Sequence, residues 1–144
     1  MRRTPWRAVS FVLILGLASM SCNGPSRGSN TQPSSASGLF ISLVVSPNTL
    51  RGAPPGSTLS SNGGCAVAQA KVSDTSGNLV DGANVSMSAG LGVFVVGTQQ
   101  LAGVAGQTTR GFFQVTYCAQ SERGTAIITA RVEDAFDTAL VTIF

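Results

Sequence analysis

The sequence predicts an all-β protein in which residues 39–144 form a single seven-stranded Greek-key β-sandwich. Apolar and polar residues alternate with a period of two in several short segments, as they do in strands that have one face in a core. Glycine recurs throughout this region, and no window repeats apolar residues at helical spacing, so helices are disfavoured. The length suits one domain and is typical of a β-sandwich.

The first 21 residues have the layout of a bacterial export signal. A basic region comes first, a short apolar run over residues 10–17 follows, and small residues then lead to Cys22. The apolar run is shorter than the roughly 20 residues that a membrane-spanning helix needs. We therefore expect residues 1–21 to be a signal peptide and Cys22 to become the N-terminus of the exported protein.

The residues before Cys22 are compatible with two kinds of processing. The stretch 17–22 resembles a bacterial lipobox, in which the cysteine receives a diacylglycerol before cleavage, although Ser19 stands where that pattern has leucine. Ser19 and Ser21 also suit ordinary signal peptidase, which would give a secreted protein. Asn23 differs from the aspartate that retains many lipoproteins in the inner membrane. The resemblance implies a lipid anchor on Cys22 and an outer-membrane lipoprotein, facing either the periplasm or the cell surface.

Residues 22–38 are expected to be the lipidated N-terminus and a flexible tether. Residues 23–38 contain no aliphatic or aromatic side chain larger than alanine apart from the prolines. Such a segment cannot bury enough apolar surface to offset its chain entropy. Its expected reach is roughly 20 to 25 Å, which would hold a domain away from a membrane surface.

The expected strands are separated by turn signals. Ser46-Pro47 ends the first strand, as is typical of a sheet edge. Residues 51–64 and 103–107 are expected to be loops, and residues 74–78 a hairpin turn. The seven segments expected to be strands are 40–45, 66–72, 85–87, 93–96, 112–118, 126–132 and 139–144.

The charge of the chain does not indicate a nucleic-acid partner. The formal net charge is +3, but Arg2, Arg3 and Arg7 belong to the expected signal peptide. The remainder holds six basic and six acidic residues and is therefore neutral overall. The pI of about 9.1 is thus a property of the precursor.

The residue inventory argues against an enzyme. The chain has no histidine, which removes the commonest general base, the commonest metal ligand and the serine triad. No G-x-S-x-G motif is present, and residues 103–106 are rich in glycine without matching a phosphate-binding pattern. We expect neither catalysis nor a cofactor.

Five acidic residues are the candidates for a metal site. Asp74 and Asp81 flank the turn at 74–78, whereas Glu133, Asp134 and Asp137 cluster between the last two expected strands. Calcium prefers such oxygen ligands, but these spacings match no calcium-loop signature. We expect instead that Asp74 caps its own turn, that the charges near the last turn are solvated, and that no metal binds.

The aromatic residues divide into two expected groups. Phe113 and Tyr117 share a face of one strand and are expected to lie in the core. Phe94 and Phe112 could be exposed, and an exposed pair would indicate a partner surface, although single exposed apolar residues are common.

Two segments carry a family resemblance. Residues 72–87 (V-S-D-T-S-G-N-L-V-D-G-A-N-V-S-M) resemble the B–C hairpin of bacterial immunoglobulin-like domains of the invasin/intimin type, which reads roughly V-x-D-x-x-G-N-x-V-x-G-x-x-V-x-F. Residues 124–132 (G-T-A-I-I-T-A-R-V) are similar to strand F of that family. The resemblance covers most of residues 39–144 and departs from the family at 99–109. It implies an immunoglobulin-like sandwich that serves as a structural or adhesive module and has no catalytic residues.

The three cysteines fit the same interpretation. With lipid on Cys22, Cys65 and Cys118 remain as one pair in an oxidising compartment. Each has the parity opposite to an inward-facing neighbour, Ala66 and Tyr117 respectively. In the immunoglobulin-like arrangement their strands are antiparallel neighbours in one sheet. The resemblance therefore implies a Cys65–Cys118 bridge on the outer face of that sheet, unlike the inter-sheet bridge of antibody domains.

Two classes of function remain open. The first is a non-enzymatic lipoprotein, exposed in the periplasm or at the surface, that binds a protein, a glycan or another envelope component. The second is a structural accessory subunit of an envelope assembly without a ligand of its own. An exposed apolar patch on one sheet would favour the first, and an evenly polar surface the second.

Overall fold

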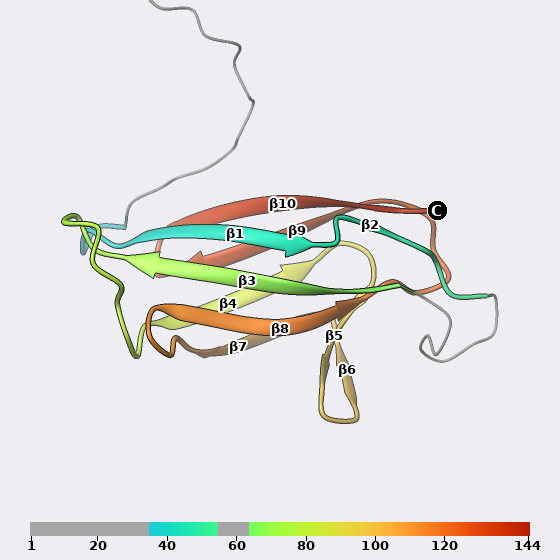
Figure 1. Ribbon diagram of the computed structural model, residues 1–144, viewed down its shortest axis with the longest axis horizontal. Coiled ribbons are helices and arrows are strands. Elements are labelled where there is room, and N and C mark those ends of the chain that lie inside the picture. The colour runs from blue at the N-terminus through green and yellow to red at the C-terminus, as the bar shows by residue number, and fades with distance from the viewer. Residues whose placement is uncertain (1–34, 55–63) are drawn as a thin grey trace, which may run out of the picture.

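The computed structural model describes residues 35–54 and 64–144, which form two five-stranded β-sheets packed face to face (Figure 1). This part of the chain contains no helix, and so no helix that could cross a membrane. The all-β class expected from the sequence is confirmed. The expected signal peptide, Cys22, and residues 55–63 of the expected loop lie outside the described residues.

The first sheet has the strand order β1-β3-β8-β5-β6, and every neighbouring pair is antiparallel. The strand β1 is at an edge, as its terminal Ser46-Pro47 predicts. The five strands are β1 (Phe40–Ser46), β3 (Cys65–Ser73), β8 (Phe112–Cys118), β5 (Val93–Val96) and β6 (Gln99–Leu101).

The second sheet has the order β2-β10-β9-β4-β7, in which the short β2 runs parallel to β10 and the other pairs are antiparallel. The strand β7 is at the edge, beside β4. The five strands are β2 (Thr49–Leu50), β10 (Ala135–Ile143), β9 (Gly124–Val132), β4 (Asn84–Ala89) and β7 (Gly103–Gln107).

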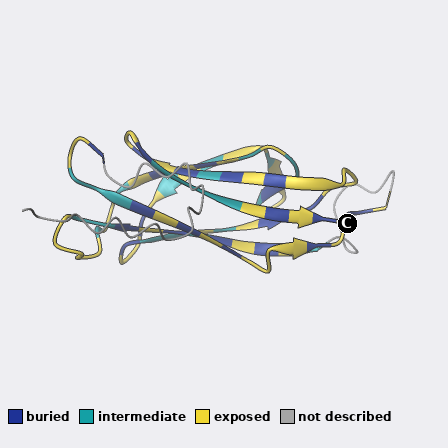
Figure 2. Cartoon of the chain, turned by 90° about the horizontal axis from the view of Figure 1, so that it is seen from above, coloured by how far each residue is buried: buried dark blue, intermediate teal, exposed yellow. Residues whose placement is uncertain are grey.

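Alternating side chains from both sheets make the core, which is visible as alternating buried and exposed bands along the strands in Figure 2. The expected inward face of β3 and the expected inward pair Val85 and Met87 of β4 are buried. Phe94 and Tyr117 meet edge to face with ring centroids 5.7 Å apart, and the Tyr117 hydroxyl donates a 2.6 Å hydrogen bond to the Leu91 carbonyl. A buried tyrosine needs such a partner for its hydroxyl.

Several sequence-based expectations are corrected. The described residues form ten strands instead of seven, because β2, β6 and β7 were not anticipated. Residues 103–107, expected to be a loop, are the strand β7, which pairs with β4 along its whole length. Phe94, which the sequence analysis gave as a residue that could be exposed, is fully buried because its ring packs against Tyr117. Phe113 is only partly buried, because it lies where the sandwich opens.

The last residues of the expected tether contact the domain. The backbone N–H of Ala36 donates to Asp134 Oδ1 at 3.0 Å, and the Ser37 hydroxyl donates to the Glu133 carboxylate. Ser35 is buried, and its backbone bonds Leu39 and Gly38. Residues 35–38, which were expected to belong to the tether, thus contact the loop between β9 and β10.

Candidate binding groove

The sandwich opens where β5 leaves β8. The register pairs Val93–Val95 with Thr116–Cys118, so that β5 covers only the last three residues of β8. Beyond this point β5 and β6 form a hairpin that projects away from the other strands of the sandwich (Figure 1). The remainder of β8 has β3 on one side and no described strand on the other. The edge strand β7 of the second sheet lies across this opening.

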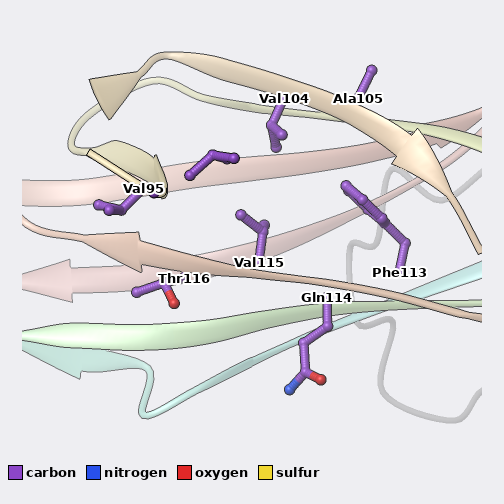
Figure 3. Close-up of a pocket in the computed structure, with 9 residues that line it drawn as sticks. Val95, Val104, Ala105, Phe113, Gln114, Val115 and Thr116 are labelled. Carbon is purple, nitrogen blue, oxygen red and sulfur yellow. The ribbon is translucent and has the colours of Figure 1, made fainter. Parts of the chain in front are cut away.

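A groove of about 400 Å³ occupies the opening (Figure 3). In Figure 3, Val104 from β7 points toward Phe113 and Val115 from β8, whereas Ala105, Gln114 and Thr116 point away from the space between them. None of the lining residues is charged, and the inward-pointing ones are apolar. The lining residues are Val95, Val96, Gly97, Val104, Ala105, Phe113, Gln114, Val115 and Thr116.

The sequence analysis did not find this groove. Neither Phe94 nor Phe112, the pair considered for a partner surface, lines it, whereas Phe113, which was expected in the core, does. The groove depends on β7, and the sequence G-V-A-G-Q of this strand carries too little apolar alternation to be recognised. The departure of residues 99–109 from the family pattern was the one available signal, since this segment includes all of β7.

The five acidic residues do not form a metal site. Among the residues that the structure describes, no group of three or more histidine, cysteine or acidic side chains could hold a metal ion. Asp74 caps its turn as expected, because its Oδ1 accepts hydrogen bonds from the backbone N–H groups of Ser76 and Asn78, both at 2.9 Å. The side chain of Asn78 also donates to Asp74, and together these hydrogen bonds lower the pKa of the carboxyl.

The carboxylates of the other four acidic residues also accept hydrogen bonds within the domain. Asp81 accepts a 2.8 Å hydrogen bond from the N–H of Arg110, which has a φ of 53°. Asp137, which lies within β10 rather than in the loop before it, accepts a 2.8 Å bond from the N–H of Leu43 in β1 and so joins the two sheets. Glu133 and Asp134 bond the 35–38 segment instead of being only solvated. These contacts account for all five candidates structurally.

Cys65 and Cys118 form a disulfide between β3 and β8. The two residues face each other in the register, with their Cα atoms 4.1 Å apart. The bridge lies within one sheet, on the face opposite to Ala66 and Tyr117, as the resemblance implies. Cys65 is exposed, whereas Cys118 is buried. A structural disulfide is typical of proteins outside the cytoplasm.

Exposed apolar side chains occur elsewhere on both sheets. Ile127 and Leu140 face each other across β9 and β10 on the outer face of the second sheet. Val44 and Val67 are diagonal neighbours on the outer face of the first. These are small groups on flat sheet faces, which are ordinary on a protein surface. The groove differs from these groups because its apolar side chains line a hollow.

No protein-family model and no curated protein sequence matches this chain. Solved structures do share its fold. The adhesin InvE of Yersinia pseudotuberculosis superposes with a TM-score of 0.55 at 21% identity, covering 75% of this chain. A beta-glycosidase from Bacteroides vulgatus gives 0.53 at 12% identity and 71% coverage. A glycosyl hydrolase family 2 member from Bacteroides cellulosilyticus gives 0.51 at 18% identity and 72% coverage.

Each of these proteins is much longer than the matched region. The chain covers 28% of InvE and 14% of each of the two hydrolases. At such low identities the likeness shows the fold alone. The similarity to the adhesin supports the invasin-type immunoglobulin-like fold that the sequence motifs imply.

Proposed function

We propose that the protein is an exported, lipid-anchored immunoglobulin-like module that binds a partner in the groove between β5, β7 and β8 and catalyses no reaction. The observation that carries this proposal is the groove itself. It is an open, uncharged hollow at the point where β5 leaves β8, and apolar side chains from both sheets line it. Concave apolar sites of this size are where proteins usually hold a ligand.

The surrounding features support a role outside the cytoplasm. The disulfide suits an oxidising compartment, and the lipobox-like residues before Cys22 suit a membrane anchor. The likeness to an adhesin is compatible with binding. The absence of histidine and the structural roles of the five acids leave the groove without an acid–base pair.

The anchor is tested by fractionation. We expect the wild-type protein to sediment with membranes of the producing bacterium and the Cys22→Ser variant to appear in the soluble fraction. A soluble wild-type protein with an unmodified N-terminus would replace the anchor with plain secretion.

The groove is tested with two matched lysine variants. Val96 lines the groove and is 46% exposed, whereas Val44 is 58% exposed on β1, away from the groove. Because both sites are exposed, neither lysine should unfold the domain. We expect Val96→Lys to lose the proteins or glycans that the wild-type domain captures from envelope extract, and Val44→Lys to keep them. If both variants capture the same components, or if the wild type captures none, the structural accessory role is the better explanation.

A further inference from the structure

We infer that the ligand of the groove is an extended, uncharged peptide segment of another protein, which adds as a strand to the free edge of β7. This inference rests on the proposed function, because it names the ligand class of the same groove. It follows from the direction of the backbone groups in β7, from the lining of the groove and from the side chains that β7 itself carries.

The ladder between β4 and β7 shows which backbone groups are used. At one end the N–H of Ala89 donates to the carbonyl of Ala102 at 3.1 Å, and at the other end the N–H of Thr108 donates to the carbonyl of Ala83 at 2.9 Å. In an antiparallel pair, residues that exchange hydrogen bonds alternate with residues that do not. Counting from both ends, Val104 and Gly106 are the residues of β7 that bond β4.

The alternate residues of β7 therefore direct both their N–H and their C=O groups away from β4. All of them are exposed, and no described strand pairs with them on that side. The strand contains no charged residue and no proline, the features by which edge strands usually avoid pairing with other chains. The outward residues are Gly103, Ala105 and Gln107.

The edge of β8 that faces the groove has fewer free backbone hydrogen-bonding groups than β7. Phe112 exchanges two hydrogen bonds with Thr109, at 2.8 and 3.1 Å, and Thr116 pairs with Val95 of β5. On the groove side of β8, only Gln114 lies between these two residues, whose backbone groups already have partners. An added strand could bond three alternate residues of β7 (Gly103, Ala105 and Gln107) but only one residue of β8, so β7 is the edge that an extended segment would join.

The side chains of such a strand would alternate between solvent and groove. Those that point inward would lie over Phe113 and Val115, in the space of about 400 Å³. This space holds no charged group to pair with, so a charged inward side chain would be desolvated without compensation. The groove therefore selects valine- or leucine-sized side chains at alternate positions.

A second copy of β7 fits this space poorly. The inward residues of β7 are Val104 and Gly106, and the glycine supplies no side chain. Two β7 strands paired with each other would leave most of the groove empty. A segment with apolar side chains at every second position fills it, and this favours a peptide of another protein.

The probe is a capped synthetic peptide, Thr-Val-Thr-Val-Thr-Val. It is added to the whole exported protein, which is expected to begin at Cys22. We expect the amides of Gly103, Ala105 and Gln107 to exchange rapidly in the free domain and to become protected when the peptide binds. The amides of Val104 and Gly106 should be protected in both states, since they bond β4 throughout. Amide exchange measured by NMR distinguishes these residues.

Ala105→Pro tests the edge itself. Proline removes an N–H that points away from β4, so the ladder of the folded domain is kept, and proline is tolerated on an edge strand in this orientation. The control Val44→Lys changes an exposed residue of β1 that lies away from the groove. We expect Ala105→Pro to weaken peptide binding by about tenfold or more and Val44→Lys to leave it within about twofold.

A second measurement does not depend on the variant folding. The same peptide N-methylated at the residues that face β7 should bind the wild-type domain at least about tenfold more weakly, because it has lost its donors. Equal binding of both peptides would overturn strand addition and leave groove binding intact. No peptide binding at all, together with loss of envelope capture in Val96→Lys, would likewise overturn only this inference. Protected outward amides in the free domain, with dimers in sedimentation, would show a second copy on the edge and overturn it as well.

Discussion

Gly106 of β7 lies directly over the ring of Phe113 of β8, so that a Cβ atom on Gly106 would stand 2.4 Å from Cε2 of the ring. The missing side chain is what lets the edge of one sheet approach the other sheet at this point. The phenylalanine ring occupies the space and forms one wall of the groove. This contact therefore sets both the spacing of the sheets and the shape of the candidate site.

We expect Gly106→Ala to lower the free energy of unfolding by about 1–3 kcal/mol, because the ring of Phe113 must move to admit a methyl group. The matched control is Gly90→Ala, where the nearest atom to an added Cβ would be 3.9 Å away. In urea unfolding, the double variant Gly106→Ala, Phe113→Leu should lose less free energy of unfolding than the two single variants lose together. Strict additivity would show that the glycine and the ring are not coupled.

Gly92 is a second close approach, at φ +75°. An added Cβ would stand 2.4 Å from the Tyr117 hydroxyl and 2.8 Å from the Cys118 carbonyl. Gly77 has a similar φ of +82° and nothing within 4 Å of an added Cβ. We expect Gly77→Ala to cost about 1–2 kcal/mol from backbone strain alone, and Gly92→Ala to cost clearly more because the clash is added. Equal losses of thermal stability in the two variants would contradict this assignment.

Tyr117 should make the domain sensitive to high pH. Burial raises the pKa of its hydroxyl from 10.0 to about 12. As the pH rises, the tyrosine of the unfolded chain loses its proton before that of the folded domain. The contribution of protonated Tyr117 to the free energy of unfolding is therefore fully present below about pH 10. It is lost between pH 10 and 12, which lowers the free energy of unfolding by about 2 to 3 kcal/mol. The chain has a single tyrosine, so the ultraviolet absorbance of tyrosinate reports this group alone. Titration at the ordinary pKa in the folded domain would show that the hydroxyl is solvated.

Tyr117→Phe is the control for that titration. We expect it to remove this part of the alkaline instability. It should also lower stability at neutral pH by about 1–3 kcal/mol, because the Leu91 carbonyl loses its donor.

The disulfide should contribute substantially to stability. Its cysteines are 53 residues apart. In the chain-entropy model, closing a loop of that length lowers the entropy of the unfolded chain and so raises the free energy of unfolding by about 4 kcal/mol. We expect the double variant Cys65→Ala, Cys118→Ala to unfold at correspondingly lower urea concentration while keeping its β-sheet spectrum. A loss below about 1 kcal/mol would mean that the reduced chain is already constrained.

The sequence by itself determined the all-β class and the inward faces of β3 and β4, and the family resemblance implied the pairing of Cys65 with Cys118. Alternation of apolar residues is a local property, and it decides which face of a strand is buried once a sheet forms. The parity of Cys65 and Cys118 follows from the same period. The turn around Asp74 was also readable, because an aspartate bonds the backbone of its own turn.

Only the tertiary structure decided the strand β7, the burial of Phe94 and the groove. The residues of β7 are small and carry little apolar pattern, so its strand conformation comes from pairing with β4, which is distant in the sequence. Phe94 is buried because the ring of Tyr117 lies against it. The groove exists because β5 stops pairing with β8 after three residues, and where one strand leaves another is set by packing between sheets, which no local pattern encodes.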